Sequence, residues 1–207
     1  MSCEDDFVNV WNMDFSSRSS LRADVDIIIN RVAIPPSSTL IACGTFSGGE
    51  VIVWELVRGM RWGQIYIIPD TEVRSSIQAV VFSPNGEMLA TGSDDEKINM
   101  YSVAIGFSRM HTLEGHTNTI YSLSFSPNNT RLVSCSGEYN GTDLSIRLWN
   151  VMEGTLVKKV DHYHVSVAAH SSNGSLIASG SGDCTIKIWD AGIEVRDRRH
   201  KFNRKRP

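Results

Sequence analysis

An internal repeat is the feature of this sequence that most limits what the chain can fold into. Three segments align with one another: VVFSPNGEMLATGSDDEKINMYS at 80–102, LSFSPNNTRLVSCSGEYNGTDLSIRLWN at 123–150 and AAHSSNGSLIASGSGDCTIKIWD at 168–190. Each has two apolar runs joined by a turn, then a turn rich in Gly, Ser and Asp, then an alternating run that ends in an aromatic residue. Short alternating runs between turn residues indicate antiparallel strands, and their repetition indicates stacked sheets of one design.

Two further copies of the repeat are less complete. A fainter repeat, VAIPPSSTLIACGTFSGGEVIVWE, occupies 32–55, and a half repeat, CEDDFVNVWN, occupies 3–12 and matches only the last run of the others. An aromatic residue closes every copy, at intervals of about 45 residues: Trp11, Trp54, Tyr101, Trp149 and Trp189. The sequence therefore predicts four full repeats, at about 26–56, 73–102, 113–151 and 160–191, after an incomplete one at 3–12.

The residues of these repeats resemble those of the WD40 repeat family. The matching motifs are Gly115-His116, FSPNG at 82–86, LATGSDD at 89–95, Trp149-Asn150 and GSGDCTIKIWD at 180–190. The similarity covers about 3–193. It implies an all-β fold of the β-propeller type, in which four-stranded blades stand around a central channel. Residues 1–195 are expected to form the WD40 repeats and residues 196–207 a disordered basic tail.

The number of strands is too small for a standard closed propeller. The half repeat supplies a third strand and a fourth at about 21–26, and the four full repeats bring the total to about eighteen. We therefore expect an open arc of four full blades plus an opening blade that lacks its first and second strands. Such a chain would be a fragment of a longer propeller or would complete its ring with another chain. The alternative is a strained four-bladed ring.

The resemblance also implies a buried chain of hydrogen-bonded side chains in each blade. In the third repeat its members are His116, Ser134, Asp143 and Trp149. Asp143 is expected to orient the imidazole of His116, which receives the hydroxyl hydrogen of Ser134. The serine oxygen would then accept the indole N–H of Trp149. Ser, His and Asp are also the members of a hydrolase triad, but a serine held by a tryptophan favours the structural role.

The other repeats depart from this pattern. The fourth repeat has Ser179, Asp183 and Trp189, with His162 one residue out of register. The second repeat has Asp95 six residues before its aromatic residue, as the third and fourth repeats do, but no histidine at the expected place. The first repeat lacks both the histidine and the aspartate. Networks are thus expected to be complete in the third repeat and partial elsewhere.

One turn of the third repeat is longer than its counterpart in the fourth. In the family, turns between second and third strands lie on one rim of the propeller, which often contacts partners. Here the turn from Ser136 to Asp143 is five residues longer than its counterpart from Ser181 to Asp183, and the insertion carries Glu138, Tyr139 and Asn140. Tyrosine is favoured in interaction hot spots, so these residues are a candidate partner-binding loop. The alternative is a solvated loop without a function, since longer loops cost little stability.

The end of the sequence is basic, although the whole chain has a net charge of −3. The basic residues of this tail are Arg196, Arg198, Arg199, Lys201, Arg204, Lys205 and Arg206. A short basic run suits a nuclear import signal, or contact with a nucleic acid or another anionic surface. The remaining interpretation is a disordered end that keeps the protein in solution.

Other classes of function find little support in the sequence. It contains no phosphate-cradling glycine loop, no HExxH motif and no cluster of metal ligands, so we expect no enzyme activity, no cofactor and no metal. No apolar run is long enough to cross a membrane, and the acidic start lacks the plan of a secretory signal. The expected protein is a cytoplasmic or nuclear scaffold that binds other proteins. The alternative is a nuclear module that contacts RNA or chromatin through its tail.

Overall fold

The computed structural model describes residues 2–4, 7–11, 18–22, 28–46, 48–57, 61–71, 75–137, 141–192 and 198–200. These residues form five antiparallel sheets, one of three strands and four of four strands. In every four-stranded sheet the strands are hydrogen-bonded in the order of the sequence. The prediction of an all-β protein built from propeller blades is confirmed.

The strands fall into an opening blade and blades 1 to 4. The opening blade contains β1 (Ser2–Glu4), β2 (Phe7–Trp11) and β3 (Arg18–Arg22). Blade 1 contains β4 (Ile29–Ala33), β5 (Leu40–Thr45), β6 (Glu50–Val57) and β7 (Arg61–Pro69). Blade 2 contains β8 (Ile77–Phe82), β9 (Met88–Ser93), β10 (Ile98–Ser102) and β11 (Ser108–Leu113).

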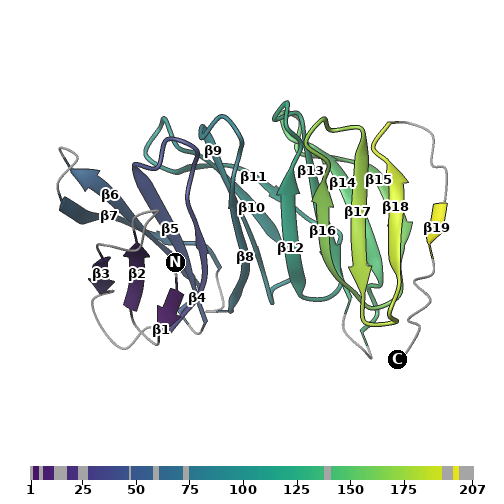
Figure 1. Cartoon of the computed structure of the whole chain (residues 1–207), viewed down its shortest axis with the longest axis horizontal. Helices are drawn as coiled ribbons and strands as arrows, with labels where there is room; N and C mark the ends of the chain where they lie inside the picture. The colour runs from purple at the N-terminus through teal and green to yellow at the C-terminus, as the bar shows by residue number, and fades with distance from the viewer. Residues whose placement is uncertain are drawn as a thin grey trace, which may run out of the picture.

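The last two blades complete the array. Blade 3 contains β12 (Ile120–Phe125), β13 (Arg131–Ser136), β14 (Ser145–Asn150) and β15 (Thr155–Asp161). Blade 4 contains β16 (Val165–His170), β17 (Leu176–Ser181), β18 (Ile186–Asp190) and β19 (Arg198–His200). The sheets stand side by side, and the opening blade and blade 4 lie at opposite ends of the molecule (Figure 1). The described residues therefore form the expected open arc.

The opening blade has more strands than the sequence predicted. The expected strand pair is present as β2 and β3, but β3 spans Arg18–Arg22 instead of 21–26. In addition, Ser2–Glu4 form β1, whose residues pair with Phe7–Asn9 in a tight hairpin. A strand of three residues is too short to show alternation, so pattern reasoning missed it.

The expectation of a fully disordered tail is wrong for Arg198–His200. These residues form β19 and pair antiparallel with β18, with Ile188 opposite Arg198 and Ile186 opposite His200. The backbone hydrogen bonds of an outer strand need no apolar alternation. The arginine-rich sequence therefore did not indicate a strand. Arg196, Lys201, Arg204, Lys205 and Arg206 lie outside the described residues.

The turns that join the first two strands of blades 2, 3 and 4 share one construction. In each, a serine hydroxyl donates to the side-chain oxygen of the asparagine two residues later, at 2.6 to 2.8 Å. The turn then needs a left-handed residue, which is Gly86 in blade 2, Asn129 in blade 3 and Gly174 in blade 4. Glycine and asparagine adopt this conformation at the lowest cost, which explains the Ser-Pro-Asn-Gly motif of the repeat.

Four apolar clusters hold the array together, one between each pair of neighbouring blades. In each cluster the aromatic residue of one blade packs on the apolar face of the blade before it. Trp54 packs on the opening blade, Tyr101 on blade 1, Trp149 on blade 2 and Trp189 on blade 3. Burying one large apolar side chain contributes about 1.5–3 kcal/mol, so these contacts stabilise the packing of neighbouring blades.

Candidate interaction surface

The structure brings the four residues of the third-repeat network together inside blade 3. The imidazole Nδ1 of His116 lies 2.6 Å from Oδ2 of Asp143, and its Nε2 lies 2.7 Å from the hydroxyl oxygen of Ser134. The indole Nε1–H of Trp149 donates to the same hydroxyl oxygen at 2.9 Å. All four side chains are buried. Each polar side-chain atom of this network thus has a hydrogen-bond partner, as burial requires.

Burial and hydrogen bonds set the protonation of this network. Burial tends to raise the pKa of Asp143, but the hydrogen bonds from His116 and Ser145 outweigh it and hold the pKa well below the usual carboxyl range. Burial lowers the pKa of His116, against the opposing effect of Asp143. The imidazole is therefore neutral, donates from Nδ1 to the carboxylate and accepts the Ser134 hydroxyl hydrogen at Nε2.

The carboxylate of Asp143 is the centre of a larger set of donors than the sequence predicted. The backbone N–H of Thr117 donates to Oδ2 at 3.1 Å, and the hydroxyl of Ser145 donates to Oδ1. The guanidinium of Arg147 lies 3.4 Å from Oδ2 and is itself buried. The sequence signal that could have identified Arg147 is its positive charge at an inward-facing position of an alternating run. Asp143 is accordingly the residue on which this part of blade 3 depends.

This geometry leaves the Ser, His and Asp set of blade 3 closed to a substrate. Ser134 has no exposed surface, and its oxygen already accepts a hydrogen bond from Trp149 while its hydrogen is held by His116. A catalytic serine needs an accessible oxygen with room for a reacting carbonyl beside it. The arrangement connects the turn before β12 with strands β13 and β14.

Acidification should weaken the fold below about pH 6.5. Burial lowers the pKa of both His116 and His162 from the ordinary value of 6.5, so the unfolded chain binds protons more readily than the folded chain. Their contribution to stability is complete above this value and is lost as the pH falls toward the lowered folded pKa. Urea midpoints between about pH 7.5 and 5 measure the slope. The His116→Gln variant should show a shallower slope than the wild type, and equal slopes for the two proteins would contradict the prediction.

Blade 4 contains a related network with a different connection. The Nδ1 of His162 lies 2.7 Å from the hydroxyl oxygen of Ser179, which also accepts the Nε1–H of Trp189 at 2.8 Å. His162 lies one residue away from the position that corresponds to His116. It still reaches the serine because its ring presents Nδ1, where the ring of His116 presents Nε2. His162 is thus a network residue that the sequence pattern placed out of register.

Asp183, a predicted member of the fourth-repeat set, is connected to His162 only through Thr185. Its Oδ1 accepts hydrogen bonds from the backbone and the hydroxyl of Thr185, and the hydroxyl oxygen of Thr185 lies 3.2 Å from Nε2 of His162. Asp183 is exposed and closes the turn between β17 and β18. The hydrogen bonds to Thr185 keep the pKa of Asp183 below its ordinary value, despite the opposite effect of burial.

In blade 2 an aspartate that sequence reasoning missed occupies the histidine's place. Asp70 is buried, and its Oδ1 accepts hydrogen bonds from the hydroxyls of Thr91 and Tyr101. Burial raises the pKa of this carboxyl. Asp95, the predicted network member, instead accepts from the backbone N–H of Lys97 and closes the β9–β10 turn. The correspondence between Asp70 and His116 was not visible in the sequence because the connecting loop is longer in blade 2. Asp70 precedes Thr91 by 21 residues, whereas His116 precedes Ser134 by 18.

The predicted partner-binding loop can be described only at its base. Glu138, Tyr139 and Asn140 lie outside the described residues. On one side of them Gly137 is buried, with its Cα close to the backbone of Val165. On the other side the hydroxyl of Thr142 donates to the carbonyl oxygen of Thr117 at 3.0 Å. Both ends of the loop are therefore attached to neighbouring turns.

Tyr163 is exposed beside this loop base and was not identified from the sequence. It lies in the turn between β15 and β16, where 48% of the side chain is exposed. Its carbonyl oxygen accepts the hydroxyl of Ser181 at 2.6 Å, and the next residue, His164, accepts the backbone N–H of Gly182 at 3.0 Å. The turn is thus fixed between those of blades 3 and 4. We call the turns at 114–119, 137–142, 161–164 and 181–185 the rim turns.

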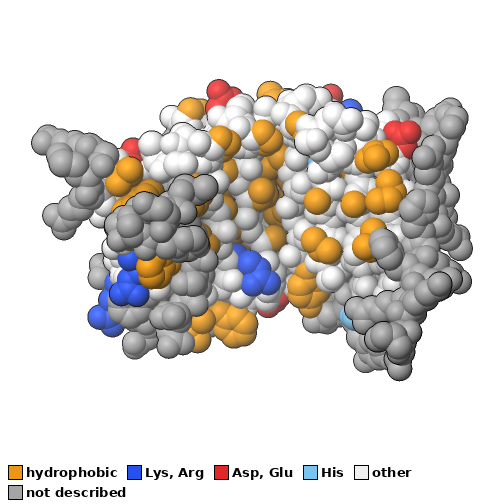
Figure 2. Space-filling view, viewed as in Figure 1, with side chains coloured by type: hydrophobic (Ala, Val, Ile, Leu, Met, Phe, Trp, Pro, Cys, Tyr) orange, Lys and Arg blue, Asp and Glu red, His pale blue; other side chains and the backbone are white. Residues whose placement is uncertain are grey.

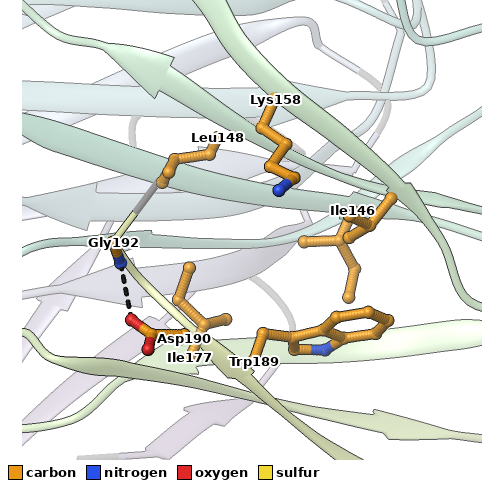
Figure 3. A pocket seen from close by; sticks show the side chains of 8 residues that line it. Ile146, Leu148, Lys158, Ile177, Trp189, Asp190 and Gly192 are labelled. Atoms are coloured by element: carbon orange, nitrogen blue, oxygen red, sulfur yellow. Dashed lines mark hydrogen bonds between the residues drawn. The ribbon is translucent and has the colours of Figure 1, made fainter. Parts of the chain in front are cut away.

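A small apolar pocket lies in the seam between blades 3 and 4 (Figure 3). Its lining consists of Ile146, Leu148, Lys158, Val160, Ile177, Trp189, Asp190 and Gly192. The side-chain oxygen of Asp190 accepts the backbone N–H of Gly192 at 2.9 Å, so one of the two charged groups is already engaged. The pocket is the outer end of the apolar cluster that joins the two blades.

The described part of the chain contains no group of three or more His, Cys, Asp or Glu side chains placed to hold a metal ion. No helix among the same residues has the length and apolar character needed to cross a membrane. Among the cysteines, Cys43 and Cys135 are buried and Cys184 is exposed.

Stacked four-stranded antiparallel sheets with an internal His–Ser–Trp connection define a protein of the β-propeller class. Sequence comparison identifies the family within this class. The family described as WD domain, G-beta repeat, matches residues 107–150 and 154–190. The family described as anaphase-promoting complex subunit 4 WD40 domain matches residues 32–125. Together the matches extend over more than half of the chain, which belongs to the WD40 repeat family.

Several longer proteins are similar to this chain. The COMPASS component SWD3 of Saccharomyces cerevisiae is 34% identical over 113 residues, which are 53% of this chain and 34% of that protein. Protein tipD of Dictyostelium discoideum is 29% identical over 156 residues, 73% of this chain and 23% of tipD. Striatin-3 of Homo sapiens is 29% identical over 175 residues, 75% of this chain and 21% of striatin-3. The chain thus spans about a third or less of the length of these relatives.

Proposed function

We propose that this chain is a non-catalytic scaffold that binds other proteins through the rim turns of blades 3 and 4. The observation that carries the proposal is the exposed aromatic ring of Tyr163, held on a turn whose backbone is hydrogen-bonded to the neighbouring blade. Aromatic side chains on rigid backbone supply large contact area at a low entropic cost, and tyrosine is enriched in hot spots.

The buried networks support this surface from below. Thr117 joins the rim turn at 114–119 to Asp143 through its backbone N–H and to Thr142 through its carbonyl oxygen. Ser136, at the end of β13, donates to the carbonyl oxygen of Asn118 at 3.0 Å. A binding surface on turns held in this way changes little in shape on binding, which lowers the entropic cost of association. Residues 138–140, which connect Gly137 to the turn that contains Thr142 in the sequence, are proposed to extend the same surface.

The relatives are consistent with a scaffold. The yeast protein is, by its name, a component of COMPASS, and one of the two families matched is described by a subunit of the anaphase-promoting complex. For this chain we propose membership of a protein assembly of unspecified composition, without enzyme activity and without a cofactor. We propose a cytoplasmic or nuclear location.

The Tyr163→Ala variant should lose partner binding while keeping its stability. Because the ring is about half exposed, we expect the free energy of unfolding to change by no more than about 0.5 kcal/mol. Binding of captured proteins should weaken by at least about fivefold, or ~1 kcal/mol. The measurement is affinity capture of proteins from a cell extract by the tagged chain, quantified by mass spectrometry and followed by titration of the most enriched protein.

Ile105→Ala is the matched control for this experiment. Ile105 is 72% exposed in the turn between β10 and β11, which lies at the opposite end of the blades from the rim turns because consecutive turns of an antiparallel sheet alternate. This variant should capture the same proteins as the wild type. If the wild type, Tyr163→Ala and Tyr139→Ala capture the same proteins in equal amounts, the rim turns are not the binding surface.

The alternative function, contact with RNA or chromatin through the tail, needs a test that spares blade 4. Deleting residues 196–207 would remove strand β19, so its effects would mix tail charge with folding. Replacing Lys201, Arg204, Lys205 and Arg206 with glutamine leaves Arg198–His200 in place. Unchanged nuclear content and unchanged nucleic-acid retention in that variant would exclude the alternative.

A further inference from the structure

The imidazole of His162 is part of a hydrogen-bond chain whose direction can be assigned. The hydroxyl oxygen of Ser179 accepts the indole N–H of Trp189, so its hydrogen is donated to Nδ1 of His162 at 2.7 Å. The hydroxyl of Thr185 donates to Asp183 at 2.6 Å, so its oxygen accepts the Nε2–H of His162 at 3.2 Å. The ring is therefore neutral, with its hydrogen on Nε2 and a lone pair on Nδ1.

Blades 3 and 4 differ in where the carboxylate lies relative to this ring. In blade 3, Asp143 contacts Nδ1 of His116 directly at 2.6 Å and is buried with it. In blade 4, the hydroxyl of Thr185 separates His162 from the carboxylate of Asp183, which is exposed. A positive charge on His116 would keep a counter-ion in contact. A positive charge on His162 would be buried without one among the described residues, which is a costly arrangement.

The other surroundings of His162 also disfavour a positive charge. Its side chain is fully buried, and Figure 2 shows only small areas of histidine side chain on the visible face of the molecule. Blade 3 faces the residue with the carbonyl oxygen of Leu144, which accepts its backbone N–H at 2.8 Å. The charged groups that act on the ring are Lys187 of β18 and Asp183 of the turn at 181–185. Burial and then Lys187 lower the pKa of His162, against the opposite effect of Asp183.

Uptake of a proton at Nδ1 of His162 removes the acceptor on which the buried chain depends. The hydroxyl hydrogen of Ser179 then faces an N–H instead of a lone pair. Because a buried charge without a counter-ion is costly, the protonated ring is driven toward water. The path is short, since the residues on either side of it, Asp161 and Tyr163, are exposed.

Two hydrogen bonds hold the turn at 161–164 against the turn at 181–185. The hydroxyl of Ser181 donates to the carbonyl oxygen of Tyr163 at 2.6 Å, and the backbone N–H of Gly182 donates to that of His164 at 3.0 Å. Both acceptors lie within two residues of the buried ring. A backbone that follows this ring into water therefore loses both bonds.

We infer that proton uptake by His162 releases the turn at 161–164, together with the ring of Tyr163, from the turn at 181–185. The closed turn is favoured completely above about pH 6.5 and is lost as the pH falls toward the lowered folded value. That this release regulates partner binding by pH rests on the proposed function, whereas the release itself is a property of the chain alone.

Hydrogen exchange at two equivalent backbone groups tests the inference without a partner. The N–H of Gly182 donates to His164, and in blade 2 the N–H of Asp94 donates to Ser76 at 3.0 Å. Each donor directly follows the last residue of the second strand of its blade. Amide exchange is followed by NMR and corrected for the pH dependence of free amides. The ratio of corrected to measured exchange gives the protection of each group.

The two groups should respond differently to acid. An exposed imidazole with the ordinary pKa of 6.5 takes up protons readily one pH unit below this value, so Gly182 should lose up to about tenfold of its protection between about pH 7.5 and about pH 5.5. Asp94 should lose none over the same range. In its blade Asp70 holds the place of the histidine, and burial raises the pKa of that carboxyl, so acid favours the closed form.

The His162→Gln variant should abolish the response. The glutamine amide can accept the hydroxyl of Ser179 and donate to Thr185, but it does not titrate. Gly182 should therefore keep the same protection at both pH values in this variant.

Lys187→Gln provides a second test that leaves the imidazole in place. Removing this cation lets the pKa of His162 in the closed turn rise toward its ordinary value, so the loss of protection at Gly182 on acidification should become smaller. Lys159→Gln, the same change on β15, should show the loss of the wild type.

Each outcome decides for or against the inference. Constant protection of Gly182 in the wild type overturns it, and so does an equal loss at Asp94, because that would be general unfolding. An acid response that persists in His162→Gln also overturns it. If His162→Gln opens the turn at every pH, Lys187→Gln decides: a smaller loss than in the wild type supports the inference, and an equal or larger loss overturns it.

The proposed function is tested separately from this release. Capture by Tyr163→Ala at neutral pH decides whether the rim turns bind partners, whatever Gly182 shows. Exchange at Gly182 decides whether the turn opens in acid, whatever Tyr163→Ala captures. Failure of one result therefore does not stand for failure of the other.

Discussion

Replacing Asp143 with alanine should lower the free energy of unfolding by about 3–5 kcal/mol, the range found when one partner of a buried ion pair is removed. The change leaves the imidazole N–H of His116, the backbone N–H of Thr117 and the guanidinium of Arg147 without their shared acceptor. All of these lie in or directly above blade 3, where water replaces the carboxylate poorly. Urea unfolding followed by tryptophan fluorescence measures the loss.

Asp183→Ala is the matched control for this variant. Asp183 holds the equivalent sequence position in blade 4, six residues before the aromatic residue, but its side chain is exposed and its acceptor role is confined to one turn. The expected change is about 0.5 kcal/mol. Equal losses at the two positions would show that sequence position, and not the burial of the carboxylate, sets the cost.

The effects of His116 and Asp143 should also be coupled. His116→Ala alone is expected to cost about 1–3 kcal/mol because buried polar groups lose their partner. The double variant should lose clearly less than the sum of the single variants, since residues of one hydrogen-bond network act together. Additive losses in the same urea experiment would count against a shared network.

Gly137→Ala should be the second strongly destabilising change, with a loss of about 1–3 kcal/mol from overpacking. A Cβ atom at this position would lie 2.7 Å from the backbone nitrogen and 2.9 Å from the backbone oxygen of Val165. Backbone atoms of a strand cannot rotate away as a side chain can, so blade 4 or the turn carrying Tyr163 must move. Thermal unfolding and partner capture should both reveal the change.

Gly63→Ala provides the comparison for this substitution. A Cβ atom at Gly63, in strand β7, would meet only the side chain of Val57, at an ordinary contact distance of 3.6 Å. We expect this variant to be as stable as the wild type or slightly more stable, because alanine restricts the unfolded chain. Similar losses for both glycines would indicate that flexibility, and not close packing between blades, explains Gly137.

Part of this protein could be derived from local sequence alone. The alternating runs and the Ser-Pro-Asn-Gly turns determine short antiparallel strands because side-chain direction and turn conformation depend on near neighbours. The regular recurrence of an aromatic residue indicated where each blade ends. The complete set in the third repeat could also be predicted, since His116, Ser134, Asp143 and Trp149 stand at the family's spacing.

Other features depended on how segments of different length meet in space. Asp70 replaces a histidine, and His162 uses its other ring nitrogen, because a hydrogen bond requires two atoms to be close and does not depend on the number of residues between them. Strand β19 depends on backbone pairing with β18, and the residue types at Arg198–His200 give no sequence signal for this pairing. The exposure of Tyr163 results from the packing of two neighbouring blades.

The sequence by itself therefore determined the class of this protein: repeated strands, their turns, and an arc of blades with open ends. Only the tertiary structure decided which polar side chains share a network, which aspartates are buried and which faces remain exposed. The physical reason is that strand and turn preferences act within a few residues of the chain. Burial and hydrogen bonding are set by neighbours that the fold brings together from different repeats.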